Sequence, residues 1–267
     1  MEEPNNAEWQ APPPPEGPVE EEGPQMSEVA TLANIFIEPG NTFRAMRAKP
    51  KFLLALIIMI VVSLGFWFAI DQKIGVGEVF IDQMKKSPQY EQMDGPTREK
   101  AAGFYRGPLF KGFFFGIIVI GSIFVVFIGG LIYWLLANAM GGSARYLQGV
   151  SVWVYSSYAP ALVAVIANIL VLLLKSKDDI DSSFMQSGGL VRANPTALID
   201  TTHSPVLNAI LAPIDLFGIF ALILGVIGLR TMMKISNSSA WSIALGLKLL
   251  GIIIGIASAL IFGGGTK

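Results

Sequence analysis

Five long apolar segments constrain the fold of this chain more than any other feature of its sequence. They cover residues 52–70, 112–137, 152–174, 206–229 and 241–262. A helix needs about 20 residues to cross the ~30 Å hydrocarbon core of a bilayer, and every segment is close to that length or longer. None alternates between apolar and polar residues as a barrel strand does. Because a helix satisfies its own backbone hydrogen bonds in lipid, we expect an all-α integral membrane protein with a bundle of five transmembrane helices.

The composition excludes several classes of function. Only 15% of the residues are charged, against about 25% in soluble domains. The formal net charge is −1, and the basic residues form no stripe interleaved with aromatics, so we expect no nucleic-acid partner. The chain has no cysteine and a single histidine, His203. It therefore lacks the residues for a thiolate or multi-histidine metal site, and we expect no metal and no cofactor.

Residues 1–28 are expected to be disordered. They contain eight glutamates and seven prolines, with no lysine or arginine. Such a segment cannot bury enough apolar surface to offset the entropy lost on ordering. Its run of prolines, residues 12–15, could bind a groove on a protein partner, but acidic low-complexity tails are more often plain solvated extensions.

Residues 29–51 are expected to form an amphipathic segment at the membrane surface. Ser27 can cap a helix, and the apolar residues that follow recur at spacings of three and four. Four basic residues then precede the first apolar segment: Arg44, Arg47, Lys49 and Lys51. These side chains could bind anionic lipid or could serve only to fix the orientation of the chain, and both interpretations stay open. Because the first helix usually dominates orientation, we expect a cytoplasmic amino terminus, although the total of the loop charges favours the reverse.

Few ionisable side chains lie inside the apolar segments, so each is a candidate site. Lys248 is followed at helical spacings by Gly251 and Gly255, which predicts one shared, packed face. It is either a binding charge inside the bundle or, as we favour, a structural lysine whose stem reaches the interface. Asp215 lies two residues after Pro213, where we expect it to stabilise the start of a helix.

The third apolar segment carries small and polar residues on one helical face. This face consists of Ser157, Ala161, Ala164 and Asn168. It is too polar to prefer lipid, so we expect this helix, which also contains Pro160, at the centre of the bundle. Asn168 is expected to bond across helices, a contact worth ~0.6 kcal/mol, or else to line a polar cavity.

No catalytic motif occurs in the sequence. There is no H-E-x-x-H, no G-x-S-x-G and no P-loop. The acidic residues of the loop 176–205 match no calcium-binding spacing. We therefore expect no catalytic residue and a protein that is not an enzyme.

Three short segments resemble a known family. Residues 36–50 contain Pro39 and end on Lys-Pro, residues 155–160 read Tyr-Ser-Ser-Tyr-Ala-Pro, and residues 214–230 begin Ile-Asp-Leu-Phe-Gly. These segments are similar to the Yip-one (Ypt-interacting protein) domain family, with Phe220 where a tryptophan is common. The resemblance covers roughly residues 30–262.

The resemblance implies a non-enzymatic five-span bundle with a cytoplasmic amino terminus. Eukaryotic members of that family are associated with Rab-type GTPases and vesicle trafficking, but no GTPase-binding motif is present here. The long polar loop between the first two spans is similar to bacterial members, which implies the bacterial cytoplasmic membrane as the location.

Two functions follow as hypotheses. The first is a membrane scaffold or organiser, surrounded by the lipid bilayer, that binds lipids or protein partners through its amino-terminal region. The second is a small transporter or channel subunit that uses Lys248, Asn168 and Asp215. Because one mid-span charge and no inverted repeat are visible, the scaffold is favoured. Gly112 and Gly116 form a GxxxG pattern, which is a weak indication of a homo-oligomer.

Overall fold

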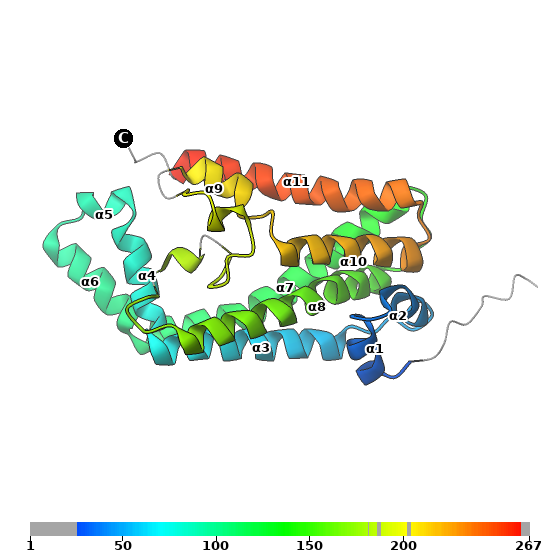
Figure 1. Ribbon diagram of the computed structural model, residues 1–267, viewed down its shortest axis with the longest axis horizontal. Helices are drawn as coiled ribbons and strands as arrows, with labels where there is room; N and C mark the ends of the chain where they lie inside the picture. The colour runs from blue at the N-terminus through cyan, green and yellow to red at the C-terminus, as the bar shows by residue number, and fades with distance from the viewer. Residues whose placement is uncertain (1–25, 181, 186–187, 202–203, 263–267) are drawn as a thin grey trace, which may run out of the picture.

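The computed structural model describes residues 26–180, 182–185, 188–201 and 204–262, which form an elongated helical bundle (Figure 1). No strand occurs within these ranges. The acidic tail expected over residues 1–28 lies outside them except for its last three residues. The helices are α1 (Glu28–Asn34), α2 (Pro39–Ala45), α3 (Leu53–Lys73), α4 (Val76–Lys85), α5 (Pro88–Gln92), α6 (Gly95–Arg106), α7 (Pro108–Ala139), α8 (Tyr146–Leu174), α9 (Pro205–Leu211), α10 (Leu216–Met233) and α11 (Asn237–Phe262), with the short 3₁₀ turns η1 (Ser182–Met185) and η2 (Pro195–Ala197).

Five of these helices are long and apolar enough to cross a membrane: α3, α7, α8, α10 and α11. The expected fold class, an all-α bundle of five transmembrane helices, is therefore confirmed. The long helices run along the length of the molecule (Figure 1). Helices α1 and α2 lie at one end, which we call the amino-terminal end, and α4, α5 and α6 lie at the other, which we call the far end.

The fourth apolar segment is not one continuous helix, so the expected span over residues 206–229 is wrong in its bounds. It divides into α9 and α10, with a break over residues 212–215. Pro213 lies in the break, where it lacks the N–H that a continuing helix would need and its ring would clash with the preceding turn. The spanning helix is α10, which continues past Arg230 to Met233.

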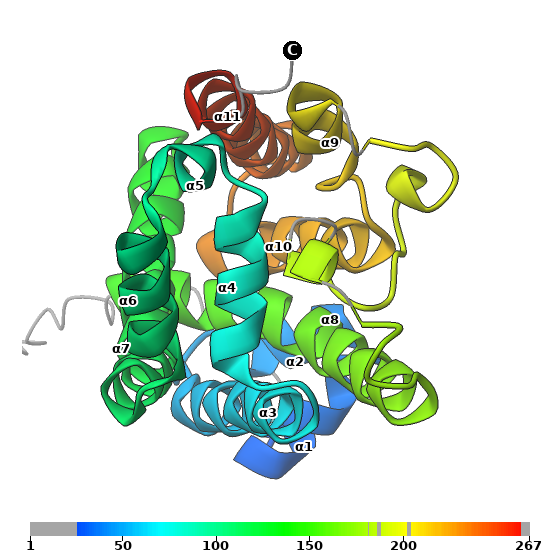
Figure 2. The same cartoon turned by 90° about the vertical axis from the view of Figure 1, so that its left-hand side faces the viewer.

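Helix α8 packs against α3, α7 and α10. In the end-on view, α3 lies on one side of it and α10 on another (Figure 2). Glycines allow α7 and α8 to approach closely: a Cβ on Gly130 would lie 2.6 Å from Cα of Val150, and a Cβ on Gly149 would collide with the carbonyl oxygen of Gly130. Such close backbone approach supplies van der Waals packing where lipid gives no hydrophobic drive.

The connection between the first two spans is a folded unit rather than an irregular polar loop. Helix α4 buries Val79 against Ile70 of α3 and Leu172 of α8 in a second, smaller apolar cluster at the far end. Arg106 of α6 forms an ion pair with Glu78 of α4 at 2.6 Å. These contacts fix α4 and α6 over the ends of the spans, as Figure 2 shows.

Candidate functional site

Helices α1 and α2, with the connection over residues 46–52, form a structure that we call the amino-terminal platform. Ser27 caps α1, its hydroxyl accepting a hydrogen bond from the amide of Ala30 at 3.1 Å. The hydroxyl of Thr31 lies 2.8 Å from the hydroxyl of Tyr155 on α8, and both residues are buried. A hydrogen bond between side chains 124 positions apart therefore attaches α1 to the bundle.

Helix α2 is inserted into the bundle itself. Phe43 is fully buried, and a Cβ on Gly228 of α10 would lie 3.0 Å from its ring and 2.6 Å from Cγ1 of Val152 on α8. Three elements thus meet at one position that only a glycine permits. The amphipathic segment expected over residues 29–51 is a pair of short helices that share the main apolar core.

The connection after α2 is held by the start of α8. The Nη2 atom of Arg145 donates to the carbonyl of Ala48 at 2.9 Å, and Nε2 of Gln148 donates to the carbonyl of Arg47 at 2.8 Å. The backbone amide of Arg145 in turn donates to Oε1 of Gln148 at 2.8 Å. The platform is therefore fixed to α8 through both of its helices and the connection that leads into α3.

Asp215 and Lys248 come together at the break in the fourth segment. Asp215 is the N-cap of α10, and its Oδ1 atom accepts a hydrogen bond from the amide of Gly218 at 2.8 Å. A Cβ on Gly218 would lie 2.6 Å from Oδ2 of Asp215 and 2.7 Å from Nζ of Lys248. A carboxylate and an ammonium of opposite charge therefore both lie close to Gly218 in the first turn of α10.

The face expected to contain Lys248, Gly251 and Gly255 is divided in the structure. Gly255 lies beside Ala209 of α9, with 3.7 Å from its Cβ position to the Ala209 Cβ, whereas a Cβ on Gly251 would meet no atom within 4 Å. Residues 248 and 255 lie almost two full turns apart and share a side, while residue 251 is rotated by about 60° from it. Gly251 therefore faces outward, and the expectation of a common packed face is wrong for that residue.

Asn168 binds a loop rather than another spanning helix. Its side chain is buried, donates to the carbonyl of Ala164 at 2.7 Å and accepts from the amide of Val191 at 3.0 Å. Gly189 has a φ of +135°, which residues with a side chain rarely adopt. A Cβ at this position would also lie 2.7 Å from Oδ1 of Asn168, so both the backbone conformation and the lack of space exclude a side chain. The amide of Leu216 donates to the carbonyl of Ala193 at 3.1 Å, which ties the same loop to the start of α10.

The other residues expected on the Asn168 face have mixed surroundings. Pro160 is buried within a continuous α8, while Ser157 is only half-buried. The buried serine is its neighbour Ser156, whose hydroxyl donates to the carbonyl of Trp153 at 3.0 Å. Ala161 is also half-buried and lines a crevice between α3 and α8.

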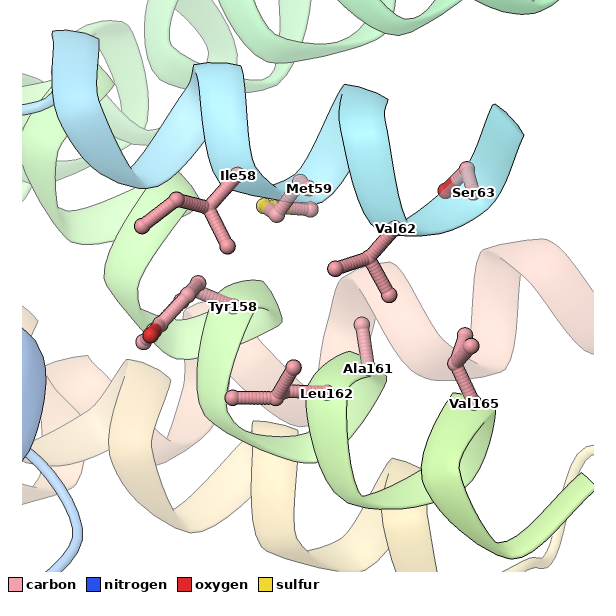
Figure 3. A pocket seen from close by; sticks show the side chains of 8 residues that line it. All are labelled: Ile58, Met59, Val62, Ser63, Tyr158, Ala161, Leu162 and Val165. Carbon is pink, nitrogen blue, oxygen red and sulfur yellow. The ribbon is translucent and has the colours of Figure 1, made fainter. Parts of the chain in front are cut away.

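The crevice beside Ala161 is too small for a solute. Apolar side chains of α3, such as Met59, face Tyr158 and Leu162 of α8 across it (Figure 3). Its volume is about 10 Å³, about the room needed for one water molecule, whereas ligand pockets measure about 300–1,000 Å³. The two helices are therefore closely packed at this crevice.

Metal-binding geometry does not occur within the described ranges: no group of three or more His, Cys, Asp or Glu residues converges there. His203 and Asp181, two members of the acidic loop considered above, lie outside those ranges.

The residues that hold the platform were not predicted from the sequence. Thr31 and Tyr155 gave a weak signal, since each is a polar residue on an otherwise apolar helical face. Gly228 gave none, because it is one of 28 glycines.

A family model for the Yip1 domain matches residues 33–259 of the chain. The match begins near the end of α1 and ends within α11, so it includes α2, the connection that follows it and nearly all of the five spans. No match was found among curated proteins or among solved structures.

Proposed function

This chain belongs to the Yip1 domain family, and on that premise we propose that it is a non-enzymatic membrane scaffold whose amino-terminal platform faces the cytoplasm and docks protein partners. The Yip1 family is a family of membrane proteins associated with trafficking. A docking role needs a surface that is held in a fixed position relative to the bilayer, since preorganisation lowers the cost of association.

The rigid attachment of the platform carries this proposal. Phe43 is buried between α8 and α10, and Thr31 bonds to Tyr155. At the same time the outer side of the platform exposes large apolar side chains, with Val29 70% and Ile37 77% accessible. A platform that is fixed on one side and apolar on the other has the character of an interaction surface.

Photo-crosslinking in the membrane tests the proposal. A photoreactive residue at Ile37 is expected to form adducts with one recurring protein, identified by mass spectrometry. The matched control is the same residue at Leu198, which is 93% exposed in the connection between η2 and α9. Tyr155→Phe removes the bond to Thr31 while keeping the ring, so it is expected to weaken the adduct at position 37. Equal adducts at positions 37 and 198, or an adduct at 37 that Tyr155→Phe leaves unchanged, would contradict a docking role for the platform.

A transporter remains the second candidate because of the break between α9 and α10. Many transporters build their sites where a half-helix begins beside a charged group, and here the first turn of α10 lies beside Lys248. The small volume of the crevice between α3 and α8 argues against a solute path on that side. If Lys248→Arg abolished a measured solute flux in a folded, inserted protein, the transporter would replace the scaffold.

A further inference from the structure

Carboxylates neutralise basic side chains at one end of the bundle but not at the other. At the far end three basic side chains form ion pairs: Lys86 with Asp82 at 3.0 Å, Arg106 with Glu78 at 2.6 Å and Lys111 with Asp71 at 2.9 Å. At the amino-terminal end four basic side chains form no ion pair with any carboxylate in the described part of the chain: Arg44, Lys49, Lys51 and Arg145. The carboxylate of Glu38, on the platform, accepts a hydrogen bond from Nδ2 of Asn41 at 2.8 Å instead. Positive charge at this end is therefore left without a negative partner among the described residues.

Three of these basic residues lie around the connection between α2 and α3. Lys49, which is exposed, and Lys51 belong to the connection itself. Arg145 reaches it from the start of α8, since its Nη2 atom donates to the carbonyl of Ala48 at 2.9 Å. We call Lys49, Lys51 and Arg145 the basic cluster.

The acidic segment of the chain joins the described structure at the basic cluster. The Nζ atom of Lys51 donates a hydrogen bond to the carbonyl of Met26, the first described residue. Met26 also accepts, on its sulfur, a hydrogen bond from Nδ2 of Asn34 on α1 at 3.6 Å. The 25 residues before it contain seven glutamates and no lysine or arginine, and three of the glutamates are consecutive at residues 20–22. The most acidic run of the segment thus ends four residues before a contact with the basic cluster.

The length of chain between these glutamates and Met26 keeps them close to the cluster. An extended chain covers at most about 3.3–3.6 Å per residue, so Glu22 lies within ~14 Å of Met26 and Glu20 within ~22 Å. A ligand on so short a tether has an effective concentration on the order of millimolar. Exposed ion pairs are individually weak, but at that concentration several weak pairs formed together are sufficient to hold the segment.

We propose that the glutamates at residues 20–22 dock on the basic cluster of their own chain. Their carboxylates accept hydrogen bonds from the ammonium groups and the guanidinium, which carry only donors. The docked segment covers the positive charge beside the spans, so another anionic ligand reaches that charge only after the segment has left. The acidic segment is therefore an autoinhibitory contact. It does not require a protein docked on the outer side of the platform, where Ile37 is exposed.

The rate at which lysines are acylated in the purified full-length chain tests this contact. The chain, in an uncharged detergent, is treated with an N-hydroxysuccinimide ester of acetic acid, and the rate at each lysine is measured by mass spectrometry. Lys100, which is exposed at the far end, is the internal reference. Replacement of all three glutamates at residues 20–22 by glutamine is expected to make Lys49 react about threefold faster, because the carboxylates no longer cover it.

A matched control variant removes the same number of charges from a more distant part of the segment. It carries glutamine in place of Glu2, Glu3 and Glu8, which lie eighteen or more residues before Met26. We expect this variant to leave the rate at Lys49 nearly unchanged. High salt is expected to speed the reaction of Lys49 in the unmodified chain and to have little effect on the variant without the glutamates at residues 20–22, since salt screens exposed charges.

Crosslinking separates docking within one chain from docking between copies. A carbodiimide, which joins a carboxylate directly to a lysine, is added to a mixture of heavy-isotope and light-isotope chains. We expect crosslinks between Lys49 and residues 20–22 that join segments of the same isotope. Crosslinks of mixed isotope would assign the acidic segment to a second copy and overturn docking within the chain. Equal acceleration at Lys49 in both triple variants would show diffuse attraction, and no acceleration in either would show an uncovered cluster; each result overturns the proposal.

Discussion

Gly218 is a position where one absent methyl group decides how a helix begins. Asp215 caps α10 by accepting a hydrogen bond from the amide of this residue, and the ammonium of Lys248 also lies close to it. The position of a Cβ falls 2.6 Å from the carboxylate and 2.7 Å from the ammonium. Any side chain at residue 218 would therefore crowd both charged groups and disturb the cap.

Gly218→Ala is expected to lower the free energy of unfolding by ~1 kcal/mol or more, the usual cost of losing an N-cap or of overpacking. Lys248 can move away at little cost because its end is flexible, so most of the loss comes from Asp215. Thermal unfolding in detergent measures the effect. Gly251→Ala is the matched control, because its Cβ meets no atom within 4 Å and alanine favours a helix more than glycine does. Equal midpoints for the two variants would contradict this account.

At the scale of helices, the far end depends on carboxylates whose pKa values are shifted. A hydrogen bond and the charge of Arg106 lower the pKa of Glu78 below its ordinary value of 4.5, against a smaller opposing effect of burial. Burial raises the pKa of Asp82, but hydrogen bonds from Ser182 and Lys86 lower it by more, so its pKa is also below the ordinary value. Both carboxylates therefore stabilise the arrangement of α4 in their charged form.

The far end is expected to loosen in acid. A carboxyl group whose pKa is lowered by folding contributes its full stabilisation above the ordinary pKa, here 4.5, and loses it as the pH falls through the lowered value. Hydrogen exchange of α4 and α6 is expected to rise relative to that of α8 as the pH falls below 4.5, after correction for the intrinsic pH dependence. Glu78→Gln should show part of this loosening already at neutral pH and a weaker change in acid. Glu99→Gln, a change on α6 away from the ion pair, should behave as the unmodified chain does.

Asn168 is the contact that holds the loop over residues 188–201 to α8. Asn168→Ala removes the acceptor of the Val191 amide, so we expect faster hydrogen exchange in peptides that cover this loop, with α8 itself unchanged. Leu170→Ala, at an exposed position on the same helix, is the control and is expected to leave the loop as it is. Unchanged exchange in Asn168→Ala would mean that the loop is held by its other contacts.

At the scale of the whole molecule, the sequence predicted the five spans well because lipid imposes a simple requirement of length and apolarity. The break at Pro213 could be predicted only in part. Asp215 was expected at the start of a helix, but the apolar segment continues through the break without interruption. The burial of Phe43 could not be predicted from the sequence, because a helix on a membrane surface and a helix packed on a protein core show the same amphipathic pattern. The contact between Thr31 and Tyr155 depends on tertiary structure, which a single sequence does not disclose.

The alternation of the spans places the platform and helices α4 to α6 at opposite ends of the bundle. A given orientation of the chain therefore predicts on which side of the membrane each end can be labelled. With the amino terminus in the cytoplasm, Lys100→Cys is expected to react with a membrane-impermeant maleimide in intact cells, and Lys49→Cys only after the cells are opened. The absence of native cysteine makes the assay clean. The reverse pattern would show that the total of the loop charges, rather than the first helix, sets the orientation.

The burial of Phe43 between α8 and α10 has a consequence for biosynthesis. The platform leaves the ribosome before any span, yet its binding site includes Gly228, which is made nearly two hundred residues later. The platform therefore reaches its place only after α10 has been made, and until then Phe43 remains unsheltered. A nascent or truncated chain that lacks α10 exposes this aromatic side chain to chaperones and proteases, so the docking of α2 reports that α10 is in place.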